Sequence, residues 1–486
     1  MMVEYEPVIG IECHVELKTA TKMFCGCRNE FGAPPNTNVC PVCLGLPGAL
    51  PVPNAKALGL IVATGAAFGA RIPEFSKFDR KNYFYPDMPK NYQISQYDMP
   101  LTVGGSVKYW MEDGTIKECR LTRIHLEEDT GKSTHAGSGD GRIAGSSYSL
   151  LDFNRAGVPL MECVSEPELQ SPEEAIAYLE SLRRTLLALG VSDVKMEEGS
   201  LRCDANVSVR LRGSAQLGTK TEIKNMNSFR SVERAIASEI ERQVGVLGSG
   251  GRVVQETRGW DEINGVTHSM RSKEEAHDYR YLPDPDLVPM EITIRDVGRV
   301  AGTLPTLPWQ RFERYTGEYG LGAKQATQMI DNFALANYFD RVVSLSGNPA
   351  QSSNFVLGEL SRLANETGVA VADSRVAPEH LAELIALVEG KQINSKIAKE
   401  LLTRTWSGAG SPAAIVEREG LAQTSDRAAI EPLVDEVLAA NAKVVADYKA
   451  GKTNVLGFLV GQVMKASRGK ADPALVNALM KDKLSR

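Results

Sequence analysis

The alternation of hydrophobic and polar residues divides the chain into two kinds of structure. Up to about residue 293, short runs with a two-residue period are separated by Gly, Pro and Asn, which predicts β-strands joined by turns. Beyond it, hydrophobic residues recur at spacings of three and four, as in residues 378–402, which predicts helices. Pro305, Pro308 and the small-residue segment 407–412 interrupt this helical pattern. We therefore predict an α+β fold class with three units, residues 1–293, 294–406 and 407–486.

The clearest predicted strand covers residues 9–17. Its odd positions are hydrophobic residues or Cys, whereas its even positions include Glu12 and His14. Strand side chains alternate between faces, so one face is predicted to be buried and Glu12 and His14 share the other. A carboxylate and an imidazole two residues apart can bind one cation. The alternative is an ordinary solvated strand face.

Two other predicted strands carry acids in the same way. Within residues 121–129, Arg123, His125 and Glu127 share one face. Within residues 158–164, Glu162 shares its face with hydrophobic residues. Because an unpaired buried carboxylate is costly, Glu162 needs a metal ion or a basic partner, or it marks the open end of the strand.

Acidic and basic side chains are mixed further along the first unit. Arg202 and Asp204 point outward from the predicted strand 201–211, and Lys224 lies in the next polar segment. Such a mixture fits a nucleotide with Mg²⁺, because carboxylates bind the metal ion and cations bind phosphates. Ion pairs on a protein surface produce a similar pattern, so this interpretation is not unique.

Four of the eight cysteines lie within 19 residues, as Cys25, Cys27, Cys40 and Cys43. Two closely spaced pairs can place four thiolates around a zinc ion, and the Gly and Pro residues between them predict a loop. Four thiolates leave no open coordination position, so the zinc ion would be structural. The alternative is four unrelated thiols. The other four cysteines lie within strand patterns, and we predict that they are buried.

Two segments have the composition of a nucleic-acid surface. Seven aromatic residues and four cations lie between Phe75 and Tyr97, a combination that binds unpaired nucleotides; the alternative is a small aromatic core. The chain also ends in a basic segment, which could bind phosphates or be a solvated tail. Its nine cations are Lys443, Lys449, Lys452, Lys465, Arg468, Lys470, Lys481, Lys483 and Arg486.

Composition narrows the class of protein. The 486 residues are 43% hydrophobic and 24% charged, which is typical of globular domains, and the formal charge of -6 excludes a uniformly basic nucleic-acid coat. The sequence has no apolar run of 18 residues and no signal or transit pattern at its N-terminus. Together with the few cysteines, this predicts a cytoplasmic protein without a membrane span.

These motifs, in this order, resemble the B subunit of the tRNA-dependent glutamyl/aspartyl amidotransferases. The resemblance covers essentially the whole chain. It is carried by the stretches Val8–Lys22, Arg80–Tyr97, Arg123–Thr134, Asp152–Pro167, Met196–Ser208, Thr221–Arg230 and Glu274–Leu287. It implies a cradle-shaped catalytic domain with an antiparallel sheet, like that of glutamine synthetase and guanido kinases. A helical domain and a YqeY-like helical tail that binds tRNA would follow.

The resemblance also implies a ligase reaction in two steps. ATP first phosphorylates the side-chain carboxylate of Glu or Asp mischarged on tRNA(Gln) or tRNA(Asn), and ammonia then displaces the phosphate. Ammonia would come from an amidase-type glutaminase partner, in a heterotrimer with a third, small partner. This chain lacks the amidase Ser-Ser-Lys signature. The sequence does not tell which mischarged tRNA is the substrate.

Individual roles follow from the resemblance residue by residue. It implies Mg²⁺ binding by Glu12, His14, Glu127 and Glu162. It implies nucleotide or phosphate contacts by Arg202, Asp204, Lys224 and Arg280. It places Lys81 and Lys90 at the reaction chamber or the ammonia path, with Tyr83 and Tyr85 near the acceptor end of the tRNA.

Two other functions remain open. A zinc-stabilised tRNA-binding protein without catalysis would have no use for acids and an imidazole directed at a metal ion. A metal-dependent phosphohydrolase would not require the aromatic segment or the basic end.

Overall fold

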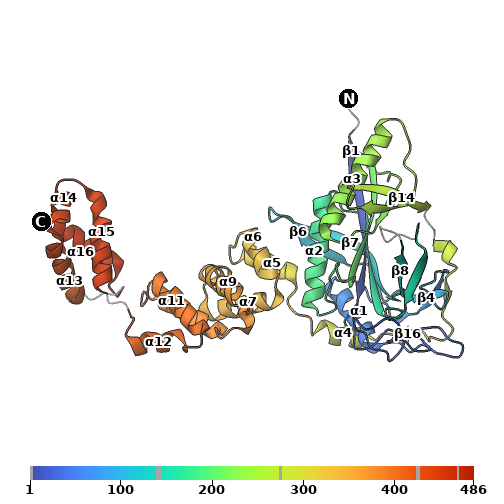
Figure 1. The fold of residues 1–486 in the computed structure, drawn as a ribbon, viewed down its shortest axis with the longest axis horizontal. Coiled ribbons are helices and arrows are strands. Elements are labelled where there is room, and N and C mark those ends of the chain that lie inside the picture. Colours follow the sequence, from blue (N-terminus) through green and yellow to red (C-terminus); the bar gives the residue numbers. More distant parts are fainter. Residues whose placement is uncertain (1–3, 138–144, 273–275, 423–426, 468–469, 486) are drawn as a thin grey trace. The chain divides into compact units, whose positions relative to one another are not determined.

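The computed structural model describes residues 4–137, 145–272, 276–422, 427–467 and 470–485 (Figure 1). The chain divides into two units, Met1–Glu313 and Arg314–Arg486. The first is a mixed α/β unit with a large sheet, and the second is helical in its described residues. Strand β16 (Met290–Glu291) is followed by helix α4 (Ile294–Ala301), so the change in hydrophobic period near residue 293 marks the change in structure.

A nine-stranded sheet forms the framework of the first unit. Its order is β14-β13-β12-β11-β1-β10-β7-β5, with β6 also paired to β7. Strands β12 and β13 are parallel, and β1 is antiparallel to both of its neighbours. The strands are β1 (Tyr5–Glu16), β5 (Thr102–Val103), β6 (Ser106–Trp110), β7 (Ile116–Glu128), β10 (Pro159–Ser165), β11 (Leu201–Leu211), β12 (Thr221–Lys224), β13 (Glu256–Asp261) and β14 (Val266–Ser272).

The described residues of the first unit also form three smaller sheets, two of which bring distant segments together. In the largest, β3 lies between β15 and β4, so residues near 80 lie beside residues near 282. The other two are the β16–β2 pair and the β8–β9 hairpin. Their strands are β2 (Phe75–Ser76), β3 (Asp79–Asn82), β4 (Tyr92–Ser95), β8 (Lys132–Ala136), β9 (Tyr148–Asp152) and β15 (Leu282–Pro283).

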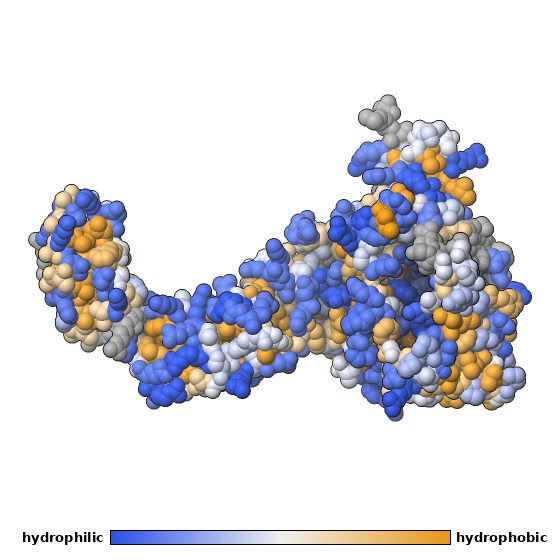
Figure 2. Space-filling model, in the orientation of Figure 1, coloured by the Kyte–Doolittle hydropathy of each residue, from blue (hydrophilic) through white to orange (hydrophobic). Residues whose placement is uncertain are grey.

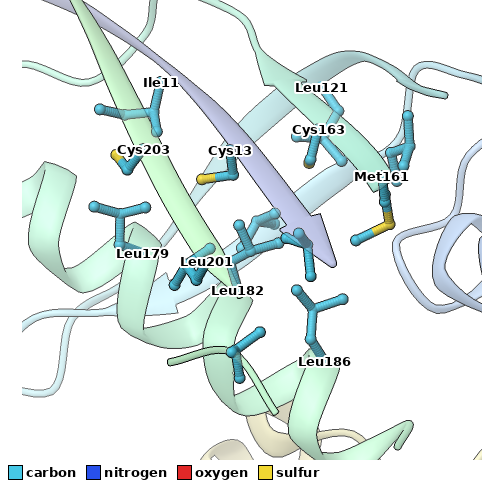
Figure 3. Close-up of a cluster of buried hydrophobic side chains, with 14 of the residues drawn as sticks. Ile11, Cys13, Leu121, Met161, Cys163, Leu179, Leu182, Leu186, Leu201 and Cys203 are labelled. Carbon is cyan, nitrogen blue, oxygen red and sulfur yellow. The ribbon is translucent and has the colours of Figure 1, made fainter. Parts of the chain in front are cut away.

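Helix α2 (Pro172–Ala188) covers one face of the large sheet (Figure 3). The helix begins at Pro172. The preceding residue, Ser171, caps it, because the Ser171 side chain accepts a hydrogen bond from the Glu174 backbone N–H. Leu179, Leu182 and Leu186 recur at helical spacing and are buried against the strands.

The strands supply the other half of this core. Helix α3 (Phe229–Gly248) contributes Val232 and Ile236 to it. Cys13, Cys163 and Cys203 meet on adjacent strands, and they are buried, as is Cys119, which confirms the prediction for these four thiols. Because Cys13 points into the core, the strand alternation directs Glu12 and His14 to the opposite face.

The second unit consists of short helices that carry many hydrophilic residues on the visible surface (Figure 2). Helix α5 (Pro308–Gly317) crosses the boundary between the units. Helix α12 contacts α10 and α11, and a separate core joins α13, α15 and α16. The helices are α6 (Ala323–Ile330), α7 (Phe333–Ser346), α8 (Pro349–Asn354), α9 (Ser361–Thr367), α10 (Pro378–Glu389), α11 (Ser395–Trp406), α12 (Pro412–Glu419), α13 (Arg427–Ala440), α14 (Ala442–Lys449), α15 (Leu456–Ala466) and α16 (Pro473–Ser485).

Among the described residues, no helix combines the length and the hydrophobicity that a membrane crossing requires.

Candidate functional site

The polar face of the large sheet brings together residues from β1, β7 and β10. His14 lies opposite Glu162 in the β1–β10 pair, and Glu162 lies opposite His125 in the β10–β7 pair. Glu127 lies one pleat further along β7, opposite Leu160. These side chains therefore project from one surface of three adjacent strands.

Three of these side chains are arranged as metal ligands. One ligand atom from each of His14, Glu127 and Glu162 lies within 4.8 Å of the others. The Nε2 atom of His14 is 3.4 Å from Oε2 of Glu162, and the Glu127 side chain is only 3% exposed. Two carboxylates and an imidazole can bind a divalent cation, so these three residues fit a metal ion.

Glu127 is held in place by side chains of strand β4. Ser95 Oγ donates a hydrogen bond of 2.7 Å to Glu127 Oε1, and Gln93 Nε2 donates one of 3.1 Å to Oε2. Each carboxylate oxygen thus has a neutral donor, which fixes the orientation of the group. Sequence patterning did not identify Gln93 or Ser95, because their contacts depend on how β4 lies against β7.

Cations surround the two buried carboxylates. Lys81 Nζ is 4.0 Å from Glu127 Oε1, and Arg123 Nη2 is 3.8 Å from Glu162 Oε1. His125 Nε2 is 3.4 Å from Glu127 Oε1 and 3.6 Å from Glu162 Oε2. His125 was not among the predicted site residues, although the alternation in 121–129 had already placed it on the face of Glu127.

Charge neighbours keep these groups ionised despite their burial. Burial alone would raise the pKa of Glu127, but the nearby Lys81 and His125 lower it to about 2. Burial would likewise lower the pKa of His14, but its interaction with Glu162 raises it to about 9. In the absence of a metal ion, the protonated imidazole therefore stabilises the carboxylates, and a bound divalent cation would take over that role.

Glu12 lies on the same face but one pleat away from the three clustered ligands. Its Oε1 accepts a hydrogen bond of 3.2 Å from Asn206 Nδ2, and it faces Asp204 across the β1–β11 pair. Burial and repulsion by Glu162, Asp204 and Glu222 raise its pKa. This surplus of acids at one end of the site favours the binding of a cation.

The predicted nucleotide contacts occupy two places. Arg202 Nη2 donates a hydrogen bond of 2.6 Å to Asp129, and Lys224 Nζ donates one of 2.5 Å to Asp204. Arg202 and Asp204 of β11 and Lys224 of β12 therefore lie beside the acidic cluster, and each takes part in an ion pair. Arg280 instead lies on an exposed turn, with its guanidinium carbon 5.9 Å from the ring centre of Phe84.

The predicted chamber residues line the neighbouring loops. Lys90 forms an ion pair with Glu128, which also accepts a hydrogen bond of 2.9 Å from the Ile94 backbone N–H. Tyr83 packs edge-on against Tyr85, with ring centres 5.8 Å apart. Burial raises the pKa of the Tyr83 hydroxyl. Tyr85 is exposed to solvent, with 51% of its surface accessible.

The four clustered cysteines converge as their spacing predicted. Cys43 Sγ lies 3.6 Å from Cys25 Sγ, 3.8 Å from Cys27 Sγ and 3.7 Å from Cys40 Sγ. Zinc–thiolate bonds of about 2.3 Å in a tetrahedron place sulfur atoms about 3.8 Å apart. The cluster therefore has the size of a four-cysteine metal site.

A buried lysine adds to this fit. Lys22 has no exposed surface, and its Nζ donates to the Asn38 carbonyl at 2.9 Å and contacts Cys43 Sγ at 3.4 Å. A buried ammonium is costly unless a negative charge lies nearby. Metal-bound thiolates carry such a charge. The hydrogen bond to Cys25 and the proximity of Lys22 lower the pKa of Cys43 to about 4.

The cysteine loop also contacts segments next to the sheet. Asn36 Nδ2 donates a hydrogen bond of 2.8 Å to the Leu151 carbonyl, and Asn154 Nδ2 donates one of 2.7 Å to the Pro34 carbonyl. Gly45 has a positive φ of 65°, and a Cβ atom there would collide with Lys90. These contacts hold the loop beside Lys90 and beside β9, the strand that precedes β10.

Comparison with known proteins gives consistent matches along the chain. The family model described as the GatB/GatE catalytic domain matches residues 7–297, and the one described as the GatB domain matches residues 337–484. The first match contains the metal-ligand cluster, the four cysteines and the aromatic segment.

Three similar curated proteins are each named as the B subunit of an aspartyl/glutamyl-tRNA(Asn/Gln) amidotransferase. The protein of Moorella thermoacetica is 54% identical over 481 residues, covering 99% of this chain and 100% of the relative. Those of Carboxydothermus hydrogenoformans and Thermosynechococcus vestitus are 50% and 51% identical over 485 residues, and the matches cover at least 97% of each relative.

Proposed function

Since the chain belongs to the family of B subunits of aspartyl/glutamyl-tRNA(Asn/Gln) amidotransferases, we propose that it converts Glu-tRNA(Gln) or Asp-tRNA(Asn) to the amide. The observation that carries the proposal is the cluster of His14, Glu127 and Glu162, which lies within the segment that matches the family's catalytic domain. A protein that only bound tRNA would not need two buried carboxylates beside an imidazole.

The chemistry requires the carboxylate of the charged amino acid to be activated. A carboxylate is a poor electrophile, whereas an acyl phosphate loses inorganic phosphate readily when ammonia attacks its carbonyl carbon. ATP supplies the phosphoryl group, and Mg²⁺ bound by His14, Glu127 and Glu162 would offset the charge of its phosphates. Glu12 lies nearby as an additional acid.

The chain's own cations would assist the same step. Lys81 and Arg123 lie within 4.0 Å of the buried carboxylates, and we propose that they contact phosphate oxygens there. Arg202 and Asp204 of β11 and Lys224 of β12 are the proposed contacts for the nucleotide. Arg280 lies beside Phe84 on the exposed turn, and its proposed contact is with a phosphate there.

The aromatic segment is the proposed site for the end of the tRNA. Tyr83 and Tyr85 pack edge-on against each other and are the proposed contacts for unpaired bases. Lys90, which pairs with Glu128, is proposed to line the reaction chamber or the ammonia path. The helical tail would bind the tRNA body. Its described residues include Lys443, Lys449 and Lys465, which are exposed, whereas Arg468 and Arg486 lie outside the described residues.

The proposal includes partners and a structural metal. An amidase-type glutaminase would supply ammonia, and with a third, small partner it would complete a heterotrimer, consistent with the word subunit in the names of the relatives. The four cysteines are proposed to hold Zn²⁺. Residues 1–293 are proposed to have the cradle fold of glutamine synthetase and guanido kinases, with helical domains at 294–406 and 407–486 after them. The protein is proposed to work in the cytoplasm.

A transamidation assay tests the function directly. The chain, assembled with its partner proteins, is given ATP, Mg²⁺, glutamine and either Glu-tRNA(Gln) or Asp-tRNA(Asn). We expect amide formation that depends on ATP. Binding of tRNA without amide formation from either substrate would instead support a non-catalytic tRNA-binding protein, and ATP hydrolysis without tRNA would support a phosphohydrolase.

A further inference from the structure

The turn at Tyr279 and Arg280, which is distant in sequence from Lys81, covers the Lys81 side chain. Helix η1 (Ala276–Tyr279) ends at Tyr279, and β15 then pairs with β3, the strand that carries Lys81. Lys81 Nζ lies 5.0 Å from the centre of the Tyr279 ring and 4.0 Å from Glu127 Oε1. One ammonium group is thus shared between an aromatic face and a carboxylate of the metal-ligand cluster.

The face of the Tyr279 ring partly replaces the water that burial removes from the Lys81 ammonium. The Lys81 side chain is 21% exposed, so most of its solvation comes from protein groups. The electron-rich face of a tyrosine ring attracts an ammonium within about 6 Å, and it does so without forming a hydrogen bond that would fix the cation away from Glu127. Tyr279 therefore limits where the ammonium can lie while leaving it free to interact with an anion.

The backbone of this turn is held in an unusual conformation. Arg280 has a φ of 46°, which is unfavourable for a residue with a Cβ atom. The neighbour of Lys81 on β3 supports it, because Asn82 Nδ2 donates hydrogen bonds of 2.8 Å to the Arg280 carbonyl and 3.2 Å to the Tyr279 carbonyl. The same strand thus carries the cation and the group that anchors the turn above it.

Neighbouring rings restrict Tyr279 from the sides. Its ring packs edge-on against Tyr83 and Tyr281, with centres 6.2 Å apart in both pairs. Tyr281 in turn stacks on Tyr97, with ring centres 4.3 Å apart and ring planes inclined by 9°. The orientation of Tyr279 is therefore set by groups on several segments.

We propose that Tyr279 is a positioning residue that holds the Lys81 ammonium beside Glu127, and that Asn82 acts through Tyr279 by anchoring the left-handed turn at Arg280. The inference rests on the proposed function, since the reaction it would assist is the activation of the amino acid by ATP. Phosphoryl transfer concentrates negative charge, and a cation held in advance stabilises that charge most effectively. Tyr279 itself needs no contact with substrate.

The test compares Tyr279→Leu, Tyr279→Phe, Asn82→Ala and the double variant Asn82→Ala/Tyr279→Leu in the assembled enzyme. Transamidation is measured with a mischarged tRNA, and kcat and KM are determined separately. Loss of a cation–aromatic contact predicts a kcat about 3- to 30-fold lower for Tyr279→Leu, with KM for tRNA within about twofold of wild type. Tyr279→Phe keeps the ring face and should retain kcat within about twofold.

The double variant separates positioning from general structural damage. If Asn82 acts through Tyr279, adding Asn82→Ala to Tyr279→Leu causes no further loss of kcat. Asn264→Ala is the matched control, because its carboxamide bonds Asp261 within the β13–β14 turn, at 3.0 Å, and this variant should behave as wild type.

Three results would overturn the inference: unchanged kcat in Tyr279→Leu, an equal loss in Tyr279→Phe, or multiplicative losses in the double variant. If Tyr279→Leu does not fold, Tyr279→Phe and Asn82→Ala still decide, since the inference requires kcat to be kept in the first and lowered in the second. Failure of the wild-type enzyme to form amide would instead refute the proposed function.

Discussion

The Nε2 atom of His14 lies 3.4 Å from Oε2 of Glu162, across the pairing of β1 with β10. The two residues are far apart in sequence but directly opposite each other in the sheet. A shift of one residue in this register would turn one of the two side chains into the hydrophobic core. The contact therefore depends on the same alternation that buries Cys13 and Cys163 on the other face.

Removal of this pair should stop the chemistry without releasing tRNA. We expect His14→Ala and Glu162→Gln to lower tRNA-dependent ATP hydrolysis by about 100-fold or more, because each removes a ligand of the proposed Mg²⁺. Glu12→Gln should lower the same rate. The measurement is phosphate release in the presence of mischarged tRNA, with tRNA affinity determined in parallel.

Glu198→Gln provides the matched control for this prediction. Glu198 pairs with Lys195 at the surface, 2.7 Å away, so its loss should leave phosphate release unchanged. Undiminished phosphoryl transfer in both His14→Ala and Glu162→Gln would refute the assignment of these residues to the metal ion.

The cysteine cluster should contain about one zinc ion per chain when the protein is purified without a chelator. We expect Cys40→Ser to lower the zinc content measured by elemental analysis. We expect Lys22→Met to weaken zinc affinity by about 10- to 100-fold, because the ammonium no longer balances the thiolate charge. Competition with a chromogenic chelator measures that affinity.

Controls for the zinc prediction come from the same unit. Cys119→Ser changes a buried thiol outside the cluster, and Lys18→Met removes an exposed lysine that pairs with Asp193. Both should retain the metal. Fresh protein without zinc would contradict the prediction, and so would an equal loss of zinc in the Cys119→Ser variant.

Packing of α2 on the sheet should dominate the stability of the first unit. Leu182 is 1% exposed, so Leu182→Ala leaves a cavity and should cost about 2–5 kcal/mol of unfolding free energy. Urea unfolding of the full chain, followed by circular dichroism, measures the change. Leu217→Ala removes the same atoms at a site that is 55% exposed, and it should change stability little; equal losses would contradict this account.

The sequence predicted the parts of this site that follow from local geometry. The two-residue period of strands placed Glu12 and His14 on the face of their strand that points away from Cys13. The spacing of the clustered cysteines predicted the convergence of Cys25, Cys27, Cys40 and Cys43. Both predictions need only a few neighbouring residues, so no knowledge of the tertiary fold was required.

Contacts between distant segments were beyond the reach of these patterns. Ser95 reaches Glu127 only because β4 lies against β7, and Tyr279 covers Lys81 only because β15 pairs with β3. Lys22 likewise appears in sequence as an ordinary lysine, although it is fully buried against the cysteine cluster. Strand pairing, which is set by the whole chain, decides such contacts.

Ion pairs within helices α13–α16, the C-terminal bundle, refine the prediction of a basic surface. Its positive charge is smaller than the tail sequence alone indicates, because Lys483 pairs with Glu431 and Asp435 at 3.1 and 2.6 Å. Lys452 pairs with Asp447 at 3.0 Å. Exposed lysines for which the described residues show no ion pair are therefore better candidates for phosphate contacts.

Replacement of Lys443, Lys449 and Lys465 by Ala together should weaken tRNA binding, with little effect on ATP binding. Each lost phosphate contact should also lower the slope of log affinity against log salt concentration by about one. Lys483→Ala is the matched control, because its ammonium is already neutralised by Glu431 and Asp435. Fluorescence titrations with labelled tRNA at several salt concentrations measure both quantities. An unchanged salt slope in the triple variant, or an equal loss of ATP binding, would refute a role of this bundle in holding tRNA.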